Sequence, residues 1–512
     1  MILLIEPISK NTDMYVPAYP LPIMELGSFV KSMVPDMDVA VISMPVDYGL
    51  PLTRGGKERI YQGLLKDLTE MKPRGVGISC TAISQAEEVI GLCEFIKAHD
   101  PDIFLFLGGY FPTIYYEEIF SRTSAVDAVV IGEGEISALS ICDDLERGRN
   151  PINDRIPNLA WKEKGKIRLT RRSGRFDLGK KALLNLDLLR YPRGYTVLPY
   201  AFSRGCPYHC NFCMEGFIRP QRREVPAEII QADLTRLSGK SKSDTLLVSD
   251  ALFKSFALFP FLRTLGMKVN FETRCDVLEP SAIPEIADGC GIIALGVESA
   301  SYDTLKRMNK VKDRTHYERY ISNAYSIFRE AVRHEIPILV FMIAGYPGDR
   351  EKDLEESLLF VQRLAQESGA GGHLFKIGEC RVYPKTKIYE TAKSTPGVAF
   401  DDQGVFGENI VRQPSAELNF DTVLAYMKEI FTLSNPTPKL DARMLDMMPF
   451  FRMPTQALRD EMIPDSCFMD ADRDILDVKR ESLLNFRRVV PRLREKYKDW
   501  MSRERETRNL SL

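Results

Sequence analysis

The sequence lacks any long hydrophobic run. Its longest apolar stretches, such as "PILVFMIAG" at residues 337–345, fall well short of the roughly 18 residues that a helix needs to cross a bilayer. The first ten residues, "MILLIEPISK", lack the basic leader, long apolar core and cleavage site of a secretion signal, and they are typical of a buried strand. We therefore expect a cytoplasmic protein with no membrane partner.

An excess of charge of one sign is also lacking. The 69 Lys and Arg residues nearly balance the 71 Asp and Glu residues, which leaves a net charge of -2. A dedicated nucleic-acid binder usually has a strongly basic surface, so this balance favours a small-molecule or peptide substrate and no nucleic-acid partner. The 44% hydrophobic and 27% charged fractions fit a soluble globular protein, and 512 residues suffice for roughly three or four folding units.

Cysteine is scarce as well, with ten in the whole chain. Seven of them stand alone in the sequence, which does not fit a secreted disulfide framework and predicts small buried hydrophobic side chains. These seven are Cys80, Cys93, Cys142, Cys275, Cys290, Cys380 and Cys467. The other three, Cys206, Cys210 and Cys213, lie together in "CPYHCNFC", and no fourth cysteine or plausible histidine ligand follows closely.

Residues 1–150 predict an α/β domain with a doubly wound, Rossmann-like topology. Short apolar runs alternate with helical patterns, which is typical of a parallel sheet covered on both faces. The expected strands are "ILLIE", "DVAVIS", "GVGISC", "IFLFLGG" and "AVVIGEGE", and a helix is expected at 83–99. Residues 151–194 are rich in turn formers and basic residues, and they predict a linker with one hairpin around "AWKEKGKIRL".

A second series of strands and helices predicts a partial (β/α)6 barrel over residues 195–420. The expected strands are 196–202, 244–250, 268–274, 291–298, 337–344 and 373–382, with helices at 226–237, 315–333 and 351–367. Ligands gather at the carboxyl ends of strands in such folds. Residues 421–512 predict a helical C-terminal region, in which the methionine-rich stretch 442–454 fits a helical core against the barrel better than a lid.

Three cysteines on one short loop after the first barrel strand predict a metal centre. Structural zinc usually takes four protein ligands, often as two separated pairs, and the second pair is missing here. A four-iron four-sulfur cluster held by three thiolates leaves one iron open for another ligand, whereas a cluster that only carries electrons normally has four cysteines. The spacing therefore favours a [4Fe-4S] cluster with an open iron, and zinc remains the alternative.

The spacing C-x3-C-x-aromatic-C at the end of a first barrel strand resembles the radical S-adenosylmethionine superfamily. The resemblance assigns Cys206, Cys210 and Cys213 to a [4Fe-4S] cluster and places Phe212 near the adenine of S-adenosylmethionine. In that family the open iron chelates S-adenosylmethionine and passes it an electron, which yields a 5′-deoxyadenosyl radical. The resemblance also implies an external one-electron reductant of the flavodoxin or ferredoxin type.

Later segments extend this resemblance along the barrel. "LLVSDALF" implies that Ser249 and Asp250 hold the ammonium group of S-adenosylmethionine, although the usual glycine-glycine-glutamate is absent. "ETRCDVL" offers Arg274 to a carboxylate, "LGVESASYDTLKRMNK" points Glu298 at the ribose or amino end, and "IAGYPGDREKDLEESL" places Gly345 in the turn after the fifth strand. Taken singly, each could also be an ordinary turn, helix cap or ion pair.

The first domain resembles the cobalamin-binding domain of cobalamin-dependent radical enzymes. In that family glycines and small hydroxyls after the strands let the corrin and its nucleotide tail approach the backbone. The matching positions are Ser79, Thr81, Gly108, Gly109, Gly132 and Gly134. The Asp-x-His-x-x-Gly motif of relatives that ligate cobalt with a histidine is absent, so the resemblance implies cobalamin with no protein histidine below the cobalt.

The resemblance implies a radical methyltransferase of the class that moves a methyl group from methylcobalamin to an unactivated carbon. An alternative keeps the same cofactors but forms a ring, contracts a ring or oxidises without methyl transfer. A second alternative is a non-catalytic cobalamin or metal-binding sensor. Methyl transfer releases S-adenosylhomocysteine together with 5′-deoxyadenosine, whereas the radical alternatives release only the latter. No further catalytic residue is assigned by the sequence.

Overall fold

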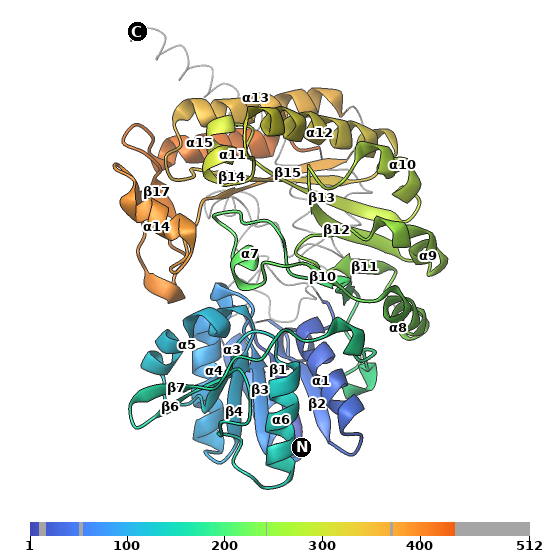
Figure 1. The fold of residues 1–512 in the computed structure, drawn as a ribbon, viewed down its shortest axis with the longest axis vertical. Helices are drawn as coiled ribbons and strands as arrows, with labels where there is room; N and C mark the ends of the chain where they lie inside the picture. The colour runs from blue at the N-terminus through green and yellow to red at the C-terminus, as the bar shows by residue number, and fades with distance from the viewer. Residues whose placement is uncertain (10–16, 51–54, 242, 369–371, 436–512) are drawn as a thin grey trace. The chain divides into compact units, whose positions relative to one another are not determined.

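The computed structural model describes residues 1–9, 17–50, 55–241, 243–368 and 372–435 (Figure 1). The chain forms two compact units, which are described separately below. The N-terminal unit contains Met1–Tyr200, Arg223–Ser243 and Gln403–Gly407. The barrel unit contains Ala201–Arg222, Asp244–Asp402 and the chain from Glu408 onward.

The N-terminal unit is built on a seven-stranded sheet with the order β2-β1-β3-β4-β5-β6-β7. Its parallel strands are β1 (Ile2–Glu6), β2 (Val39–Ser43), β3 (Gly75–Ser79), β4 (Phe104–Gly108) and β5 (Ala128–Val130). Four of the five residues of β1 are buried, as expected for an apolar strand with both faces covered. The order in which the chain adds strands to the sheet reverses between β1 and β3, which pair in parallel. Ligands of such sheets bind outside the carboxyl ends of the strands at this switch point.

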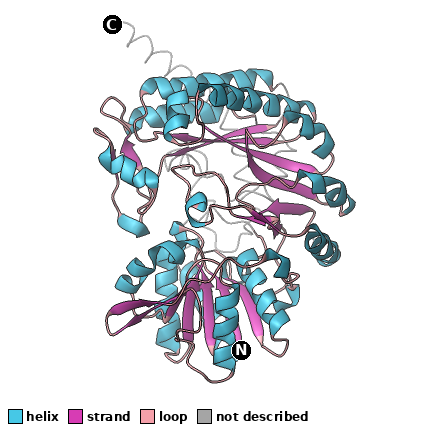
Figure 2. Ribbon diagram, in the orientation of Figure 1, coloured by secondary structure: helices cyan, strands magenta, loops and turns pink. Residues whose placement is uncertain are grey.

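Helices cover both faces of this sheet, which gives the doubly wound α/β architecture expected from the sequence (Figure 2). They are α1 (Leu21–Met33), α2 (Met44–Asp47), α3 (Gly56–Met71), α4 (Ala86–His99), α5 (Tyr110–Arg122) and α6 (Glu135–Glu146). Helix α1 packs against α6, and α4 packs against α5. In the view of Figure 1, α6 lies in front of the strands.

The hairpin expected within residues 151–194 is formed by β6 (Leu159–Glu163) and β7 (Lys166–Leu169). Strand β6 pairs antiparallel with β5, so the hairpin extends the first sheet. Leu159 and Ala160, which pair with β5, are buried there, and so is Trp161, which pairs with Arg168 of β7. This segment therefore contributes structure of its own to the N-terminal unit.

A second sheet has six strands in the order β15-β14-β13-β12-β11-β8. They are β8 (Leu198–Tyr200), β11 (Thr245–Val248), β12 (Lys268–Arg274), β13 (Cys290–Glu298), β14 (Ile338–Ala344) and β15 (His373–Glu379). The neighbours from β11 to β15 pair in parallel. Six strands at the expected places, with two edges, form the partial barrel that the sequence predicts.

The outer helices of the barrel unit include α9 (Phe259–Thr264), α10 (Ile283–Ile286), α11 (Tyr302–Arg307), α12 (Arg314–Arg333) and α13 (Glu351–Glu367). After β15 follow α14 (Lys387–Ser394), the small hairpin of β16 (Ala399–Phe400) and β17 (Val411–Gln413), and α15 (Phe420–Thr432). Helix α15 packs on β15 and α13. Of the expected C-terminal helical region, α15 is described, whereas Cys467 and the stretch 442–454 lie outside the described residues.

Among the described helices, none combines the length and the apolar character that crossing a membrane requires.

Candidate functional site

The three clustered cysteines lie on the loop that connects β9 (Ser203–Arg204) to α7 (Glu215–Ile218). The other described cysteines are all buried, as the sequence predicts. By contrast, Cys206 and Cys210 are partly exposed and Cys213 is exposed, and all three are free thiols. The accessible thiols of the described residues are therefore concentrated on this loop.

Two glycines allow the cysteine loop to fold closely over its own backbone. A Cβ on Gly205, which has φ +89°, would lie 2.2 Å from the Gln221 carbonyl oxygen. A Cβ on Gly216 would lie 2.1 Å from the carbonyl oxygen of Tyr208. Both distances are far shorter than a real carbon–oxygen contact, so any side chain here would force the loop open. The Cys206 N–H donates to the Arg219 carbonyl at 3.0 Å, which closes the loop at its base.

Asn211, which directly follows Cys210, ties the loop to the end of α11. Its backbone N–H donates to the Met308 carbonyl at 2.9 Å, and its Nδ2 donates to the Arg307 carbonyl at 2.7 Å. Nearby, Nδ2 of Asn309 donates to the His209 carbonyl at 2.7 Å. The position of the thiols thus depends on where α11 ends.

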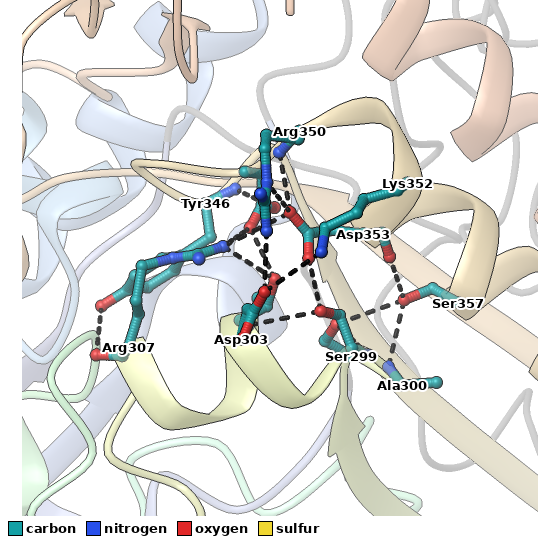
Figure 3. A network of polar contacts seen from close by, with 12 residues as sticks. Ser299, Ala300, Asp303, Arg307, Tyr346, Arg350, Lys352, Asp353 and Ser357 are labelled. Carbon is teal, nitrogen blue, oxygen red and sulfur yellow. Dashed lines mark hydrogen bonds and ion pairs between the residues drawn. The ribbon is translucent and has the colours of Figure 1, made fainter.

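A buried polar network in turn holds α11 against the turn after β14 (Figure 3). Asp349, only 1% exposed, accepts hydrogen bonds from Arg307 Nη2 at 2.6 Å, from Thr304 Oγ1 at 2.7 Å and from the Tyr346 N–H at 2.8 Å. Burial raises the pKa of Asp349 to about 6, although Arg307 and Thr304 oppose this shift. At the other end of the network, Asp353 accepts from the Ser301 hydroxyl at 2.5 Å. Figure 3 shows Asp303 and Arg307 of α11 facing Arg350 at the start of α13.

The cysteine loop offers sulfur ligands, and fewer of them than a structural zinc site usually takes. Within the described part of the chain, no group of three or more His, Cys, Asp or Glu side chains is placed to hold a single metal ion. Structural zinc usually takes four protein ligands, whereas cysteine thiolates are the usual ligands of iron–sulfur clusters. Three accessible thiols on one loop are therefore the ligand type that such a cluster takes.

Arg274, at the end of β12, points at this loop. Its Nη1 donates to Cys210 Sγ at 3.3 Å, while Nε and Nη2 donate to the two carboxylate oxygens of Asp276 at 2.8 and 2.9 Å. Burial would raise the pKa of Asp276, but the hydrogen bonds and charge of Arg274 outweigh it, so the pKa is lowered. The guanidinium expected to bind a ligand carboxylate is thus already paired with a carboxylate of the protein.

Glu298 ends β13 in a strained conformation beside a buried lysine. Its φ of +71° is rare for a residue with a side chain, and such strain is typical of functional positions. Lys310 Nζ donates to Glu298 Oε1 at 2.7 Å and lies 5.8 Å from the centre of the Phe212 ring. Gly296 leaves room for this ion pair, because a Cβ there would lie 2.8 Å from Glu298 Oε1. Glu298 and Phe212 are therefore brought into one neighbourhood.

Asp250 lies inside the protein and braces the strand that leads into the cysteine loop. It is 5% exposed and accepts from the Ser203 hydroxyl at 2.5 Å and from the N–H groups of Phe202 and Ser203 at 2.7 and 3.0 Å. Burial raises its pKa to about 6, against the effect of these donors. Ser249 next to it is exposed. Gly345 takes φ +74° in the turn after β14, near Pro414.

The positions expected to contact cobalamin lie at the carboxyl ends of β3, β4 and β5. Ser79 and Gly108 end β3 and β4 and pair with each other in the sheet. A Cβ on Gly108 or on Gly132 would meet nothing within 4 Å, so open space lies over both. Gly132 also has φ +84°, and its N–H donates to Thr113 Oγ1 at 2.9 Å. The open space over Gly108 and Gly132 would let a ligand approach the backbone at this edge.

The remaining expected positions are used to build the loops of this edge. Gly109 has φ +105°, and a Cβ there would lie 2.4 Å from the Cys80 carbonyl oxygen, so Gly109 is required by the backbone itself. The backbone N–H and the hydroxyl of Thr81 both donate to Gln85 Oε1, at 2.9 and 3.1 Å. A Cβ on Gly134 would lie 3.5 Å from Leu26, at ordinary packing distance.

A carboxyl pair formed by Glu6 at the end of β1 and Asp47 at the end of α2 was not expected from the sequence. The Ser43 hydroxyl donates to Glu6 Oε2 at 2.5 Å, the Ser43 N–H donates to Asp47, and the Tyr195 hydroxyl donates to Asp47 at 3.1 Å. Burial raises the pKa of Glu6 and of Asp47 to about 7, although these donors oppose the shift. Isolated acidic residues carry no sequence signal for such a pair.

Other residues of the site were also missed by sequence reasoning, namely Asn211, Arg307 and Lys310. The signal that could have found them is their place inside or next to the quoted motifs, since Asn211 lies between two cysteines and Arg307 and Lys310 follow Glu298 in one segment.

Two family models match the chain. The model described as B12 binding domain matches residues 30–140, and the model described as Radical SAM superfamily matches residues 200–361. The first match covers the edge with Ser79 and Gly108, and the second covers the cysteine loop and the turn with Gly345. Both matches agree with the resemblances drawn from the motifs.

Curated relatives are similar to part of this chain. The anaerobic magnesium-protoporphyrin IX monomethyl ester cyclase of Synechocystis is 25% identical over 304 residues, which are 54% of this chain and 56% of the relative. The hopanoid C-3 methylase of Methylococcus capsulatus is 28% identical over 270 residues, 49% of this chain and 50% of the relative. The chain thus spans about half the length of these relatives.

The structure of the radical S-adenosylmethionine methyltransferase TsrM from Kitasatospora setae, with cobalamin and a [4Fe-4S] cluster bound, has a similar fold. Its TM-score is 0.67 at 14% sequence identity, and the match covers 97% of this chain and 99% of that one. At this identity the likeness establishes the fold and no more.

Proposed function

The chain belongs to the radical S-adenosylmethionine enzymes that carry a B12 binding domain, and on that premise we propose that it is a methyltransferase acting on an unactivated carbon. The named relative that methylates hopanoids and the similar fold of a radical methyltransferase support this reading. The observation that carries it is the loop of three accessible thiols at the barrel strand ends, joined in one chain to the open glycine edge of the first sheet.

The proposed cluster ligands are Cys206, Cys210 and Cys213. When bound, the [4Fe-4S] cluster supplies the electron that cleaves S-adenosylmethionine, and cobalamin supplies the methyl group. The chain holds the thiols through the tight turns at Gly205 and Gly216.

The proposed contacts of S-adenosylmethionine are Phe212, Ser249, Glu298 and Gly345, with Asp250 and Arg274 behind them. The Glu298 carboxylate is kept in place by Lys310, which leaves its other oxygen for a ligand N–H or hydroxyl group. Asp250 and Arg274 make hydrogen bonds within the protein and fix the walls of the site. The proposed cobalamin contacts are Ser79, Thr81, Gly108, Gly109, Gly132 and Gly134.

The substrate is proposed to be a small molecule or peptide, and the electron donor an external one-electron carrier of the flavodoxin or ferredoxin type. Enzymes of the Radical SAM superfamily need such an external reductant. A second candidate function, ring formation with the same cofactors, is favoured by one observation, the match to the cyclase of Synechocystis.

The test is a count of two nucleoside products. The anaerobically purified chain, loaded with cluster and cobalamin, is incubated with S-adenosylmethionine and titanium(III) citrate, and both nucleosides are measured by mass spectrometry. A methyltransferase forms S-adenosylhomocysteine as well as 5′-deoxyadenosine, because S-adenosylmethionine is also the methyl donor. Formation of 5′-deoxyadenosine without S-adenosylhomocysteine would favour the cyclase reading, and Cys210→Ala is the control that should form no 5′-deoxyadenosine.

A further inference from the structure

The guanidinium of Arg274 is held at the cysteine loop by a nearly complete set of hydrogen bonds. Nε and Nη2 donate to Asp276, and Nη2 also donates to the Lys310 carbonyl at 3.0 Å. Nη1 donates to Cys210 Sγ at 3.3 Å. A guanidinium has five N–H donors, and these contacts use four of them. The Nε and Nη2 groups, which together could bind a ligand carboxylate, are bound to Asp276, whereas Nη1 faces the sulfur of Cys210.

Neighbouring side chains keep the guanidinium in this orientation. Arg274 is 6% exposed, and its guanidinium carbon lies 3.8 Å from the centre of the Tyr208 ring, which belongs to the cysteine loop itself. Asp276 is braced from the other side by His316, whose Nε2 lies 3.2 Å from Asp276 Oδ2. A buried cation that left Asp276 would lose its partner, so Arg274 is fixed next to Cys210.

We propose that Arg274 tunes the iron–sulfur cluster by donating a hydrogen bond to the Cys210 thiolate, and thereby raises the reduction potential of the cluster. Hydrogen bonds to cluster sulfurs and nearby charge are among the features that set such potentials. The cluster gains one negative charge when it takes one electron from the external donor, and no bond to the protein forms or breaks. A fixed cation beside one ligand stabilises that reduced state. This inference rests on the proposed cluster at Cys206, Cys210 and Cys213.

Substitutions of Arg274 and of Asp276 should shift the reduction potential in opposite directions, which tests the proposal. Arg274→Met removes a positive charge and the N–H donor, so the reduced cluster loses stabilisation and the potential becomes more negative. Asp276→Asn removes a negative charge and keeps a hydrogen-bond acceptor for Arg274, so the potential becomes less negative. Arg274→Lys keeps the charge and should give a smaller change than Arg274→Met. Looser packing alone would not move the two charge variants in opposite directions.

The experiment is a potentiometric titration of the full-length protein with its cluster, without S-adenosylmethionine. Iron content is measured first, and the reduced cluster is then followed by electron paramagnetic resonance as titanium(III) citrate lowers the potential. At the wild-type midpoint, we expect the ratio of reduced to oxidised cluster to fall about tenfold in Arg274→Met, which is about 59 mV for one electron. Arg263→Met is the control, because Arg263 lies on α9 and pairs with Asp288 at 3.9 Å.

The outcomes separate this inference from the proposed function. Equal potentials for the wild type, Arg274→Met and Asp276→Asn, with full iron content, would overturn the role of Arg274 and leave the cluster in place. A wild-type protein that binds no cluster would overturn the proposed function instead. If Arg274→Met does not retain iron, the test rests on the reduction potential of Asp276→Asn. A potential less negative than that of the wild type supports the proposal, and an unchanged potential refutes it.

Discussion

Asp349→Asn should destabilise the barrel unit and loosen the cysteine loop. The carboxylate of Asp349 accepts three hydrogen bonds, including one from the cation Arg307, and its side chain is 2% exposed. An asparagine keeps only one of the two carboxylate oxygens. Its NH2 group, which is a donor, would face either the donors of Arg307 and Thr304 or the N–H donor of Tyr346. Removing one partner of a buried charge pair typically costs about 3–5 kcal/mol.

The expected effect reaches the proposed cluster through α11. Arg307 accepts a hydrogen bond from Asn211 at its carbonyl oxygen, so a displaced Arg307 moves the residue beside Cys210. We therefore expect Asp349→Asn to lose about 3 kcal/mol of unfolding free energy, taken from the lower end of that range because asparagine keeps one acceptor. Iron content after cluster reconstitution should fall with it.

The assay is urea unfolding followed by circular dichroism, together with iron content per chain. Asp303→Asn is a matched control, because Asp303 is an aspartate of α11 that belongs to the same network (Figure 3). The Asp303 side chain is 42% exposed and pairs with Arg350 at 2.7 Å, and exposed ion pairs are worth about 0–1 kcal/mol. If Asp349→Asn cost no more than Asp303→Asn and kept its iron, the buried network would not hold the loop.

Three further predictions follow from the site. Gly216→Ala should lower the iron content at unchanged secondary structure, because its Cβ would lie 2.1 Å from the Tyr208 carbonyl oxygen; iron equal to wild type would contradict the tight loop. Gly108→Leu should weaken cobalamin binding without unfolding the protein, because a Cβ there meets nothing within 4 Å, and unchanged cobalt content would refute that pocket. The pKa of Glu6 in the folded state is raised to about 7 from its ordinary value of 4.5. The free energy of unfolding should therefore fall by up to about 3 kcal/mol as the pH rises from below 4.5 through 7, at about 1.36 kcal/mol per pKa unit. In urea unfolding, Glu6→Gln should lose less stability over that pH range, and an equal loss in the variant and the wild type would contradict this role of Glu6.

The architecture was predictable because both sheets are built from short apolar strands. Both faces of a strand such as "ILLIE" are buried, so its apolar residues form a continuous run and do not alternate with polar residues. The same rule located the six strands of the second sheet. The hairpin of β6 and β7 was also visible, but its pairing with β5 was not, because turn residues reveal a hairpin and say nothing of its neighbour.

The cysteine loop was predictable for a different reason, because its three expected ligands, Cys206, Cys210 and Cys213, lie close together in the sequence. The supporting residues are far apart in sequence. Asp250 is bound by Ser203, 47 positions away, and Arg274 reaches Cys210 across 64 positions. A motif can place a carboxylate after a strand, but it cannot tell whether the carboxylate faces a ligand or a loop that folds over it. Gly109 illustrates the same limit, because the structure uses it to approach the Cys80 backbone.

The central claim is that one chain holds an iron–sulfur cluster on three cysteines and cobalamin on its first sheet. The most direct test is the iron and cobalt content of protein produced without oxygen in cells supplied with cobalamin, measured with its optical spectrum. The account predicts about four irons and one cobalt per chain, with the iron lost in Cys210→Ala and the cobalt retained. Iron without cobalt would contradict the cobalamin site, and iron that survives in Cys210→Ala would contradict the cluster site.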